Sequence, residues 1–404
     1  MRDSERLPSG GLSPEFRLAV ATSMWPDDAD RLARINSAMQ LPIDWELLVR
    51  ILRRHRIGGL AFQGLRRASV PVPEAVQATL QAAAERQVNK SLAFAAENLR
   101  VSKLLGDAGI PCASLKGASL SMLTFGSLAL RHSRDIDLLV SPEQALRADE
   151  ALAAAGFALQ MPIGPHSVDQ KKHWIRERKH FEYMSGKNVA LELHWRLFDN
   201  PRLLATEHDP RTWMEVPVFP QRSLRTLSMP DLLLYLCVHG ANHMWFRLKW
   251  LADVHAILRQ SGPETLERLQ ADAKGQGCER AVGQALALME RLYGFPDPQG
   301  FPGAATASLV NEALTAMTAG NAASELETIP FATTRVAVAR FRLKSEWGFW
   351  IREARGALAD EHDRKSARLP HWMKFLLPIL RMPLWMWRRL RGQGRSHRGV
   401  DLDS

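Results

Sequence analysis

The fold of this chain is decided by the stretch Arg134-Asp135-Ile136-Asp137-Leu138-Leu139-Val140. Charged and apolar residues alternate from Asp135 to Leu138, which predicts a β-strand whose side chains point to opposite faces by turns. The two aspartates therefore share one face. Two carboxylates aimed at one spot repel each other unless a cation lies between them, and Mg²⁺ with oxygen ligands is the usual solution. An exposed strand edge can carry the same pair without a metal.

A second alternating stretch is Leu191-Glu192-Leu193-His194-Trp195. Its Glu192 lies 55 residues after Asp137. It predicts another strand, with Glu192 and His194 on one face and apolar residues on the other. Three carboxylates on adjacent strands could bind two divalent ions. The two-ion arrangement stabilises both the attacking and the leaving oxygen of an in-line displacement at phosphorus.

Upstream of the acids, the apolar run at residues 110–115 predicts a buried strand that ends at Lys116-Gly117. A helix is expected from Ala118 to about Leu130, and Ser119 in its first turn is a candidate for nucleotide binding. Free backbone N–H groups and the helix dipole attract phosphate at such a helix start. Phosphate donors are therefore expected beside the acids.

The flanking patterns indicate an α+β fold, with a small mixed sheet between N-terminal and C-terminal helical regions. Strand-like runs at 179–184 and 189–197 are joined by a turn-rich tetrapeptide, which predicts a hairpin. Ser228 and Pro230 predict the start of a helix that runs to about Met244. We expect a mobile leader (1–30), an N-terminal helical region (31–105), a core (106–227), a helical domain that completes the site (228–294), a linker (295–308) and a C-terminal helical region with a basic amphipathic end (309–404).

Composition narrows the class of protein. The 404 residues have room for about two or three folded units, and 46% hydrophobic with 24% charged residues is an ordinary globular balance. The three cysteines form no close pair, which argues against a disulfide framework and a cysteine zinc site. No secretion signal or membrane-spanning stretch is recognised, so we expect a cytoplasmic protein. The net charge of +10 favours anionic partners.

Several motifs together resemble the uncharacterised bacterial nucleotidyltransferase family of the DNA polymerase beta-like superfamily. The resemblance covers about residues 40–300. It is carried by Leu115-Lys116-Gly117, Arg131, the stretch from Asp135 to Val140, Glu192-Leu193-His194-Trp195-Arg196-Leu197, Ile43-Asp44-Trp45, Arg53-Arg54-His55-Arg56, His239-Gly240-Ala241-Asn242-His243 and Leu248-Lys249-Trp250-Leu251-Ala252-Asp253.

The resemblance implies a nucleotidyltransferase core in which Asp135, Asp137 and Glu192 are the catalytic, metal-binding acids. The Lys116-Gly117 turn would then hold the nucleotide phosphates. The sequence departs from the wider superfamily in having Lys116-Gly117-Ala118 where a Gly-Gly or Gly-Ser pair is typical.

Further residues are candidates for nucleotide binding, each beside a plainer interpretation. Arg131 and Arg134 could neutralise a triphosphate through paired N–H donors, or could be solvated loop arginines. His194 could contact phosphate or act as the base for an acceptor hydroxyl, although Glu192 or Asp137 could also accept the proton.

The helices beyond the core add four more candidates. His239 and His243 are one helical turn apart and could line the nucleotide site or be structural; position 240 is Gly rather than the Glu of a zinc protease, which argues against zinc. Lys249 and Asp253 could form an ordinary ion pair four residues apart, or could face the nucleotide.

The segment 369–391 mixes tryptophan and other apolar residues with lysine and arginine, which suits a helix on an anionic membrane surface or in a partner's groove. Packing on its own domain is the alternative. Sequence-specific DNA binding is not expected, since phosphate attraction alone reads no sequence.

The sequence thus favours an enzyme that transfers a nucleoside monophosphate from a nucleoside triphosphate (NTP) to a hydroxyl or similar acceptor, with Mg²⁺ and release of pyrophosphate. The acceptor is a small molecule, a protein or an RNA end. The alternatives are a catalytically inactive nucleotide-binding sensor or scaffold, and a membrane-surface partner in a biosynthetic assembly.

Overall fold

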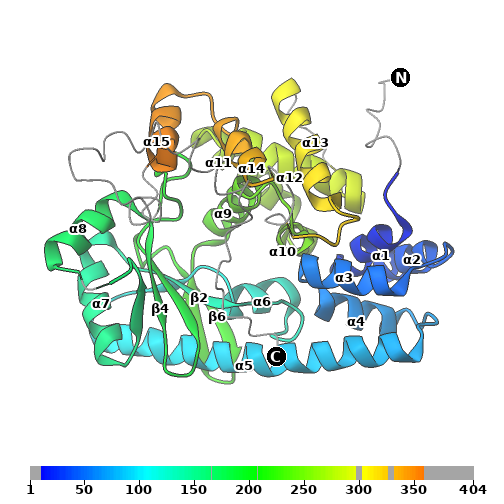
Figure 1. Ribbon diagram of the computed structural model, residues 1–404, viewed down its shortest axis with the longest axis horizontal. Coiled ribbons are helices and arrows are strands. Elements are labelled where there is room, and N and C mark those ends of the chain that lie inside the picture. The colour runs from blue at the N-terminus through cyan, green and yellow to red at the C-terminus, as the bar shows by residue number, and fades with distance from the viewer. Residues whose placement is uncertain (1–10, 165, 207, 297–302, 326–331, 359–404) are drawn as a thin grey trace, which may run out of the picture. The chain divides into compact units, whose positions relative to one another are not determined.

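The computed structural model describes residues 11–164, 166–206, 208–296, 303–325 and 332–358 (Figure 1). The chain divides into two compact units, Met1–Ser345 and Glu346–Ser404. Within the described residues, the second unit contains one helix, α15 (Trp347–Leu358). The segment 369–391 lies outside the described residues.

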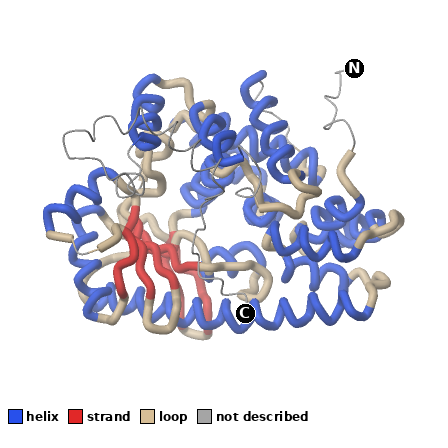
Figure 2. The backbone as a smooth tube through the Cα atoms, viewed as in Figure 1, coloured by secondary structure: helices blue, strands red, loops and turns tan. Residues whose placement is uncertain are grey.

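A mixed sheet forms the centre of the first unit. Its five strands lie in the order β1 (Ala113–Ser114), β2 (Asp135–Leu139), β5 (Ala190–His194), β4 (His180–Met184) and β3 (Ala158–Met161). The β2–β5 pair is parallel, and the other neighbours are antiparallel. Figure 2 shows the strands gathered on one side of the unit with helices around them. The predicted α+β class with a small mixed sheet is confirmed.

One face of this sheet is apolar and covered by helices. Alternate residues of β2, β4 and β5 enter a core shared with α5 (Glu74–Asp107), α7 (Ala145–Ala154) and α8 (Val168–Glu177). Trp195 anchors this core, because its side chain is fully buried and its indole N–H donates to the backbone oxygen of Arg178. The other face of β2, β4 and β5 carries Asp135, Asp137, Glu182, Glu192, His180 and His194 beside the apolar Leu139, Met184 and Ala190, so the packing that buries one face presents the acids on the opposite one.

Helices precede the sheet, as predicted for the N-terminal region. They are α1 (Pro14–Ser23), α2 (Ala29–Ala38), α3 (Trp45–His55) and α4 (Gly58–Arg67). The 34-residue helix α5 then runs along the base of the unit in Figure 1, with α4 near its start and the sheet near its end. Asp44 caps α3 by accepting a hydrogen bond from the Leu47 N–H.

The prediction of a mobile leader over residues 1–30 is wrong for residues 14–23, which form helix α1. Ser13 caps this helix and Pro14 occupies its first turn. Phe16, Leu18 and Ala19 are all buried, and burial on nearly every side leaves no apolar stripe to recognise in the sequence. Residues 1–10 lie outside the described part.

After the sheet the chain forms a hairpin and a further set of helices. The hairpin, β6 (Met214–Phe219) and β7 (Arg222–Thr226), has no counterpart in the sequence-based expectations; Val218 and Leu224 pack it against Ala95 of α5 and Ala118. The helices are α9 (Met229–Asn242), α10 (Leu248–Gln260), α11 (Pro263–Gly275), α12 (Glu279–Tyr293), α13 (Ala304–Thr318) and α14 (Ala332–Phe341).

Two expected boundaries shift. The helix after Gly117, α6 (Ala118–Phe125), ends earlier than the predicted Leu130, because Gly126 adopts a left-handed conformation at its end. Helix α13 begins inside the expected 295–308 linker, of which 297–302 lie outside the described residues.

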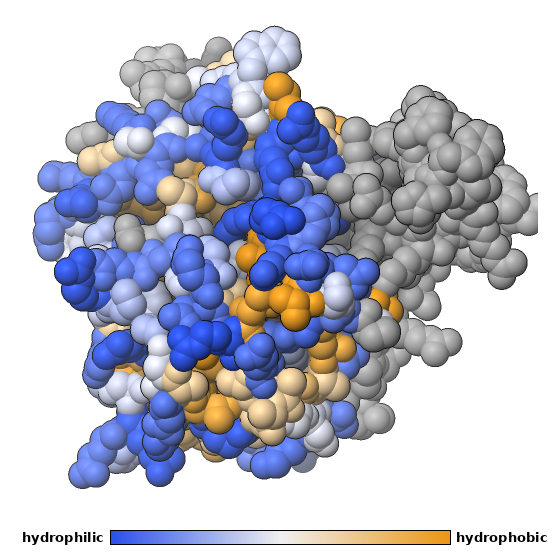
Figure 3. Space-filling model, turned by 90° about the vertical axis from the view of Figure 1, so that its left-hand side faces the viewer, coloured by the Kyte–Doolittle hydropathy of each residue, from blue (hydrophilic) through white to orange (hydrophobic). Residues whose placement is uncertain are grey.

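The surface and helix lengths add one point about the environment of the protein. Figure 3, which looks onto the side where α7 and α8 lie, shows a mainly hydrophilic face with apolar patches between the charged residues. Ile163 and Val168 are among the exposed large apolar residues. Among the described residues no helix combines the length and the apolar character needed to cross a bilayer.

Candidate functional site

The candidate site lies on the polar face of β2, β5 and β4. Asp137 of β2 is paired in register with Glu192 of β5, and Glu192 is in turn paired with Glu182 of β4. Two residues further along β5, His194 is paired with His180 of β4. Partners in register project to the same side of a sheet, so these side chains gather on one face.

Asp137 is the most enclosed acid of the face, with 2% of its side chain exposed. Its Oδ1 atom lies 3.3 Å from Lys116 Nζ and 3.3 Å from His194 Nε2, but forms no hydrogen bond of good geometry. Burial works against the charged carboxylate, but the Lys116 ammonium and the contact with His194 together hold the pKa of Asp137 below its ordinary value. Burial lowers the pKa of Lys116, but Asp137, together with Tyr235, Asp135 and Glu192, raises it above its ordinary value.

Glu192 is more accessible than Asp137, with 27% of its side chain exposed. Its Oε2 atom lies 3.0 Å from His194 Nε2, 3.9 Å from Lys179 Nζ and 4.0 Å from His180 Nε2. Burial raises the pKa of this carboxyl, but the contact with His194 and the charge of Lys179 hold it well below its ordinary value. Glu192 therefore carries a negative charge at neutral pH.

Asp135 is at the start of β2 and is half-buried. Burial, and then the charges of Asp137 and Glu192, raise the pKa of Asp135 to about 6. The repulsion arises because Asp135 and Asp137 share one face of β2, and Glu192 lies opposite Asp137 on β5. The three acids nevertheless do not form the tightest group: among the described residues, the set whose ligand atoms all lie within 4.8 Å of one another is His180, Glu192 and His194.

The turn at Gly117 brings a helix start next to the acids. Gly117 has φ +72° and ψ −128°, a conformation that residues with a Cβ rarely adopt, and it precedes α6 without a side-chain cap. A small pocket beside this turn is lined by Ser91, Gly117, Ser133 and Asp135, among others. Ser119, predicted to bind nucleotide, is fully buried and its hydroxyl bonds to the backbone oxygens of Ser114 and Lys116. Its hydroxyl is thus occupied in shaping the turn.

Basic groups lie close enough to Asp135 for the charges of Lys116 and Lys249 to lower its pKa against the effects of burial and the other acids. Burial, and then the charges of Arg131 and Arg56, hold the pKa of Lys249 well below its ordinary value. Burial, and then Arg247 and Arg134, lower the pKa of Arg56 to about 9. Cations that repel one another in this way favour the arrival of an anion.

Arg56 was quoted in a sequence motif but assigned no role. It follows α3 in a left-handed conformation, and its buried Nε atom has no hydrogen-bond partner. Its neighbours in that motif are structural: Arg54 donates to backbone oxygens at the end of α13, and His55 accepts from the Leu248 N–H. The charge of Asp135 acts on Arg56, and the sequence does not give this proximity.

Arg131 and Asp253, both predicted to bind nucleotide, are paired with each other. Arg131 Nε and Nη2 donate to the two carboxylate oxygens of Asp253 at 2.9 and 3.0 Å, and the exposed fractions of the two side chains are 3% and 1%. The expected pair of Asp253 with Lys249 is not formed; Lys249 Nζ donates to the backbone oxygen of His132. The donors of Arg131 are thus occupied in fixing the loop before β2 to α10.

Helix α9 presents a row of rings toward Lys116. The Lys116 ammonium lies 6.0 Å from the centroid of the Tyr235 ring, which adjoins His239 at 5.6 Å. His239 and His243 both pack on Trp250, and burial, followed by nearby cations that include Lys116, holds the pKa of both histidines well below the ordinary value. These histidines are therefore neutral aromatic groups, and their place among the rings supports the structural interpretation.

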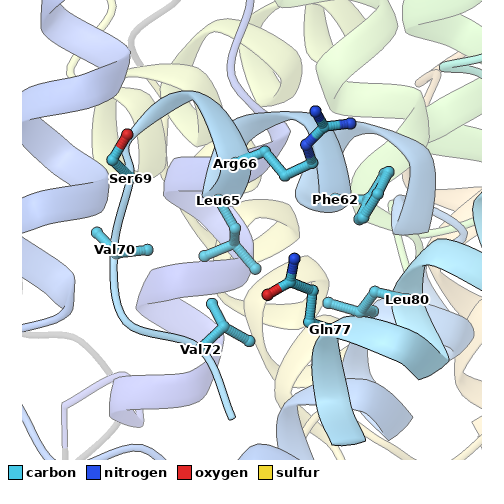
Figure 4. Close-up of a pocket in the computed structure, with 8 residues that line it drawn as sticks. All are labelled: Phe62, Leu65, Arg66, Ser69, Val70, Val72, Gln77 and Leu80. Atoms are coloured by element: carbon cyan, nitrogen blue, oxygen red, sulfur yellow. The ribbon is translucent and has the colours of Figure 1, made fainter. Parts of the chain in front are cut away.

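A separate pocket lies away from these groups, between α4 and the start of α5 (Figure 4). Phe62, Leu65 and Leu80 face its interior, and Arg66 lies at its rim beside the Phe62 ring. It contains none of the predicted site residues.

The residues on the acidic face fit a bound cation. The Asp137 Oδ1 atom and both ring nitrogens of His194 are buried without a hydrogen bond, although unbonded buried polar atoms are costly in a folded protein. A divalent cation would satisfy the carboxylate oxygen and would reduce the repulsion that raises the pKa of Asp135.

A mixed sheet that carries buried acids beside a glycine turn and a helix start is a scaffold suited to binding metal and phosphate together. The family model described as uncharacterised nucleotidyltransferase matches residues 42–294, and the chain belongs to this family. Comparison with curated proteins gives no match.

Proposed function

We propose that this protein is a Mg²⁺-dependent nucleotidyltransferase that transfers a nucleoside monophosphate from an NTP to a hydroxyl or similar acceptor. One observation carries the proposal. A buried Asp137 oxygen without a hydrogen bond lies on the same face of the sheet as Glu192, next to the start of helix α6 at Gly117. Membership of the nucleotidyltransferase family supports the reaction class.

Asp135, Asp137 and Glu192 are the residues that would hold Mg²⁺. When bound, the metal supplies positive charge to the phosphate oxygens and to the departing pyrophosphate. The proposal follows from the oxygen chemistry of these side chains, which is the chemistry that Mg²⁺ prefers.

The other groups of the site bind and orient the nucleotide. The free backbone N–H groups at the start of α6 donate to phosphate oxygens, and Lys116, Lys249 and Arg56 supply positive charge around them. The glycine at 117 lets the backbone approach the phosphates without a side chain between them. Their main contribution to the rate is to hold the reactants in line.

The reaction itself exchanges one P–O bond for another. The acceptor oxygen attacks the α-phosphorus, the bond from that phosphorus to the bridging oxygen breaks, and pyrophosphate leaves with the bond's electron pair. The proton of the acceptor passes to a base on the same face, for which Asp137, Glu192 and His194 are the candidates. The three groups adjoin one another: His194 Nε2 lies 3.3 Å from Asp137 Oδ1 and 3.0 Å from Glu192 Oε2.

The test of this proposal is Asp137→Asn, which keeps the shape of the side chain and removes its charge. With α-labelled NTPs, Mg²⁺ and cell extract as the source of acceptor, we expect pyrophosphate release and label transfer to fall by at least about 100-fold. Asp169→Asn, at an exposed position of α8, is the matched control and should transfer at the wild-type rate. An Asp137→Asn variant that is folded by circular dichroism and still active would remove the mechanism.

Nucleotide binding without transfer is the second candidate. It is favoured by the Lys116–Asp137 contact, in which an ammonium already neutralises the acid that a catalytic metal would need. A wild-type protein that binds labelled NTP but releases no pyrophosphate with any of the four NTPs would support this candidate over the transferase.

A further inference from the structure

His180 of β4 is a potential metal ligand that the sequence did not indicate. Its register partner is His194, and the two imidazole rings are stacked with centroids 5.0 Å apart. Both histidines lie close to Glu192, whose Oε2 atom is 3.0 Å from His194 Nε2 and 4.0 Å from His180 Nε2. Two nitrogen donors and one oxygen donor therefore converge on one small space.

These separations suit the ligands of one metal ion. Bonds of about 2.0–2.2 Å from a metal to nitrogen and oxygen place two neighbouring ligand atoms roughly 3 to 3.5 Å apart. The Glu192–His194 distance already falls in that range, and the His180–Glu192 distance exceeds it by about 0.5 Å. A small rotation of the half-buried His180 side chain closes that difference.

The strands hold this group rigidly. Phe181 and Leu193, which alternate with the ligands on β4 and β5, are fully buried in the core on the opposite face. The antiparallel pairing of the two strands fixes His180 against His194 and Glu182 against Glu192. Ligands carried by paired strands are positioned more precisely than ligands on loops.

Three of the four ring nitrogens of His180 and His194 form no hydrogen bond. His194 is 1% exposed, and neither of its ring nitrogens forms a hydrogen bond. His180 Nδ1 is also buried without one, while its Nε2 atom contacts Glu182 Oε1 at 3.1 Å. Burying an imidazole with both nitrogens unsatisfied is costly, and a metal ion would satisfy the nitrogen that faces Glu192.

Charged groups nearby permit a cation. Glu182 and Glu192 supply two negative charges, and Lys179, 3.9 Å from Glu192, supplies one positive charge. Lys179 has 27% of its side chain exposed, so its ammonium can move toward solvent when a cation binds.

We propose that His180, Glu192 and His194 form a second cation site, which selects Mn²⁺, Co²⁺ or Zn²⁺ over Mg²⁺. Imidazole nitrogen suits these transition metals, whereas carboxylate and water oxygens suit Mg²⁺. The inference deepens the proposed function, because Glu192 belongs to both sites. The protein thereby has one all-oxygen position at Asp135 and Asp137 and one mixed nitrogen and oxygen position beside it.

The first experiment is a titration of metal-free, full-length protein with Co²⁺, in which binding is monitored by the visible absorption of the bound ion. Wild type should bind Co²⁺, with Mg²⁺ displacing it only weakly. His180→Gln should weaken Co²⁺ binding by at least about 10-fold, which is the scale of losing a metal-site contact. His173→Gln, on the exposed face of α8, is the matched control and should bind Co²⁺ as wild type does. Equal Co²⁺ affinity in His180→Gln and wild type would overturn the proposal.

A second measurement needs no variant and covers the case in which a histidine substitution disturbs folding. Pulsed electron paramagnetic resonance of Mn²⁺ bound to wild type should show coupling to ¹⁴N of imidazole. Bound Mn²⁺ without nitrogen coupling would overturn the second site even if the protein transfers nucleotides with Mg²⁺. Nitrogen coupling in a protein that releases no pyrophosphate would leave the second site standing and remove the proposed function.

Discussion

Lys116 links the two parts of the candidate site, the glycine turn and the acidic face. Its ammonium contacts Asp137 and lies over the Tyr235 ring, while its backbone oxygen accepts the Ser119 hydroxyl. Burial of both charged partners makes each dependent on the other. A nucleotide phosphate would offer this ammonium a second anionic partner within the same small region.

Gly117 is the residue whose backbone conformation the turn requires. A Cβ at this position would lie 3.7 Å from Ser133 Oγ, which is ordinary contact, so the cost of Gly117→Ala comes from the positive φ. We expect the free energy of unfolding to fall by about 1–3 kcal/mol and nucleotide binding to weaken. Urea denaturation and NTP titration measure the two effects.

Gly186 provides the control for this substitution. It is exposed, and a Cβ there meets no heavy atom within 4 Å. Gly186→Ala should change the free energy of unfolding by no more than about 0.5 kcal/mol. Comparable losses in the two alanine variants would mean that the Gly117 turn is not strained.

At the scale of elements, a buried ion pair between Arg131 and Asp253 helps to hold the loop before β2 to α10. Arg131→Met would leave Asp253, which is fully buried, without its counterion. Removing one partner of a buried pair costs about 3–5 kcal/mol, so we expect a loss of that size in the free energy of unfolding. Arg131→Met/Asp253→Asn should recover part of the loss in a double-mutant cycle. A single variant as stable as wild type would show that the loop is held by other contacts.

The sequence predicted elements well where their signals are local. Ser228 caps α9, and the turn at 185–188 joins β4 to β5, because capping and turn chemistry act over a few residues. Helix α1 was missed because it is buried nearly all round. The β6–β7 hairpin was missed because its strands alternate weakly and carry Pro217 in the middle.

The candidate site was predictable only in part. Strand alternation placed Asp135 with Asp137 and Glu192 with His194, since a period of two is visible in the sequence. It did not give the register that sets His180 opposite His194, nor the approach of Arg56 from α3 or the Arg131–Asp253 pair. These depend on which elements pack together, and that information is absent from any short motif. The assigned roles of the site residues stay predictions.

At the scale of the whole molecule, buried histidines make stability depend on pH. Burial, followed by the charge of Arg259, lowers the pKa of His255 to about 3, and burial with nearby cations lowers that of His132 to about 2. The unfolded chain takes up these protons below about pH 6.5, whereas the folded protein does not. The free energy of unfolding therefore falls as the pH falls below about 6.5. Above that pH, these two histidines are neutral in both states and no longer change it.

His255→Phe tests this contribution, because the His255 ring packs against those of Tyr293 and Phe295. The loss in unfolding free energy between pH 7.5 and pH 5.5 should be smaller in this variant by about 1.4 kcal/mol. His173→Gln, at an exposed position, should leave the pH dependence unchanged. Chemical denaturation at the two pH values provides the measurement, and parallel curves for wild type and His255→Phe would contradict the expectation.

The parallel pairing of β2 with β5 bears on how the protein matures. Fifty residues separate the end of β2 from the start of β5, and these include α7, α8 and the two strands on the far side of β5. A nascent chain on the ribosome thus carries Asp137 for some time before Glu192 and His194 exist. The acids meet only when β5 enters the sheet between β2 and β4, so the proposed cation sites can be completed only after the chain has been synthesised beyond His194.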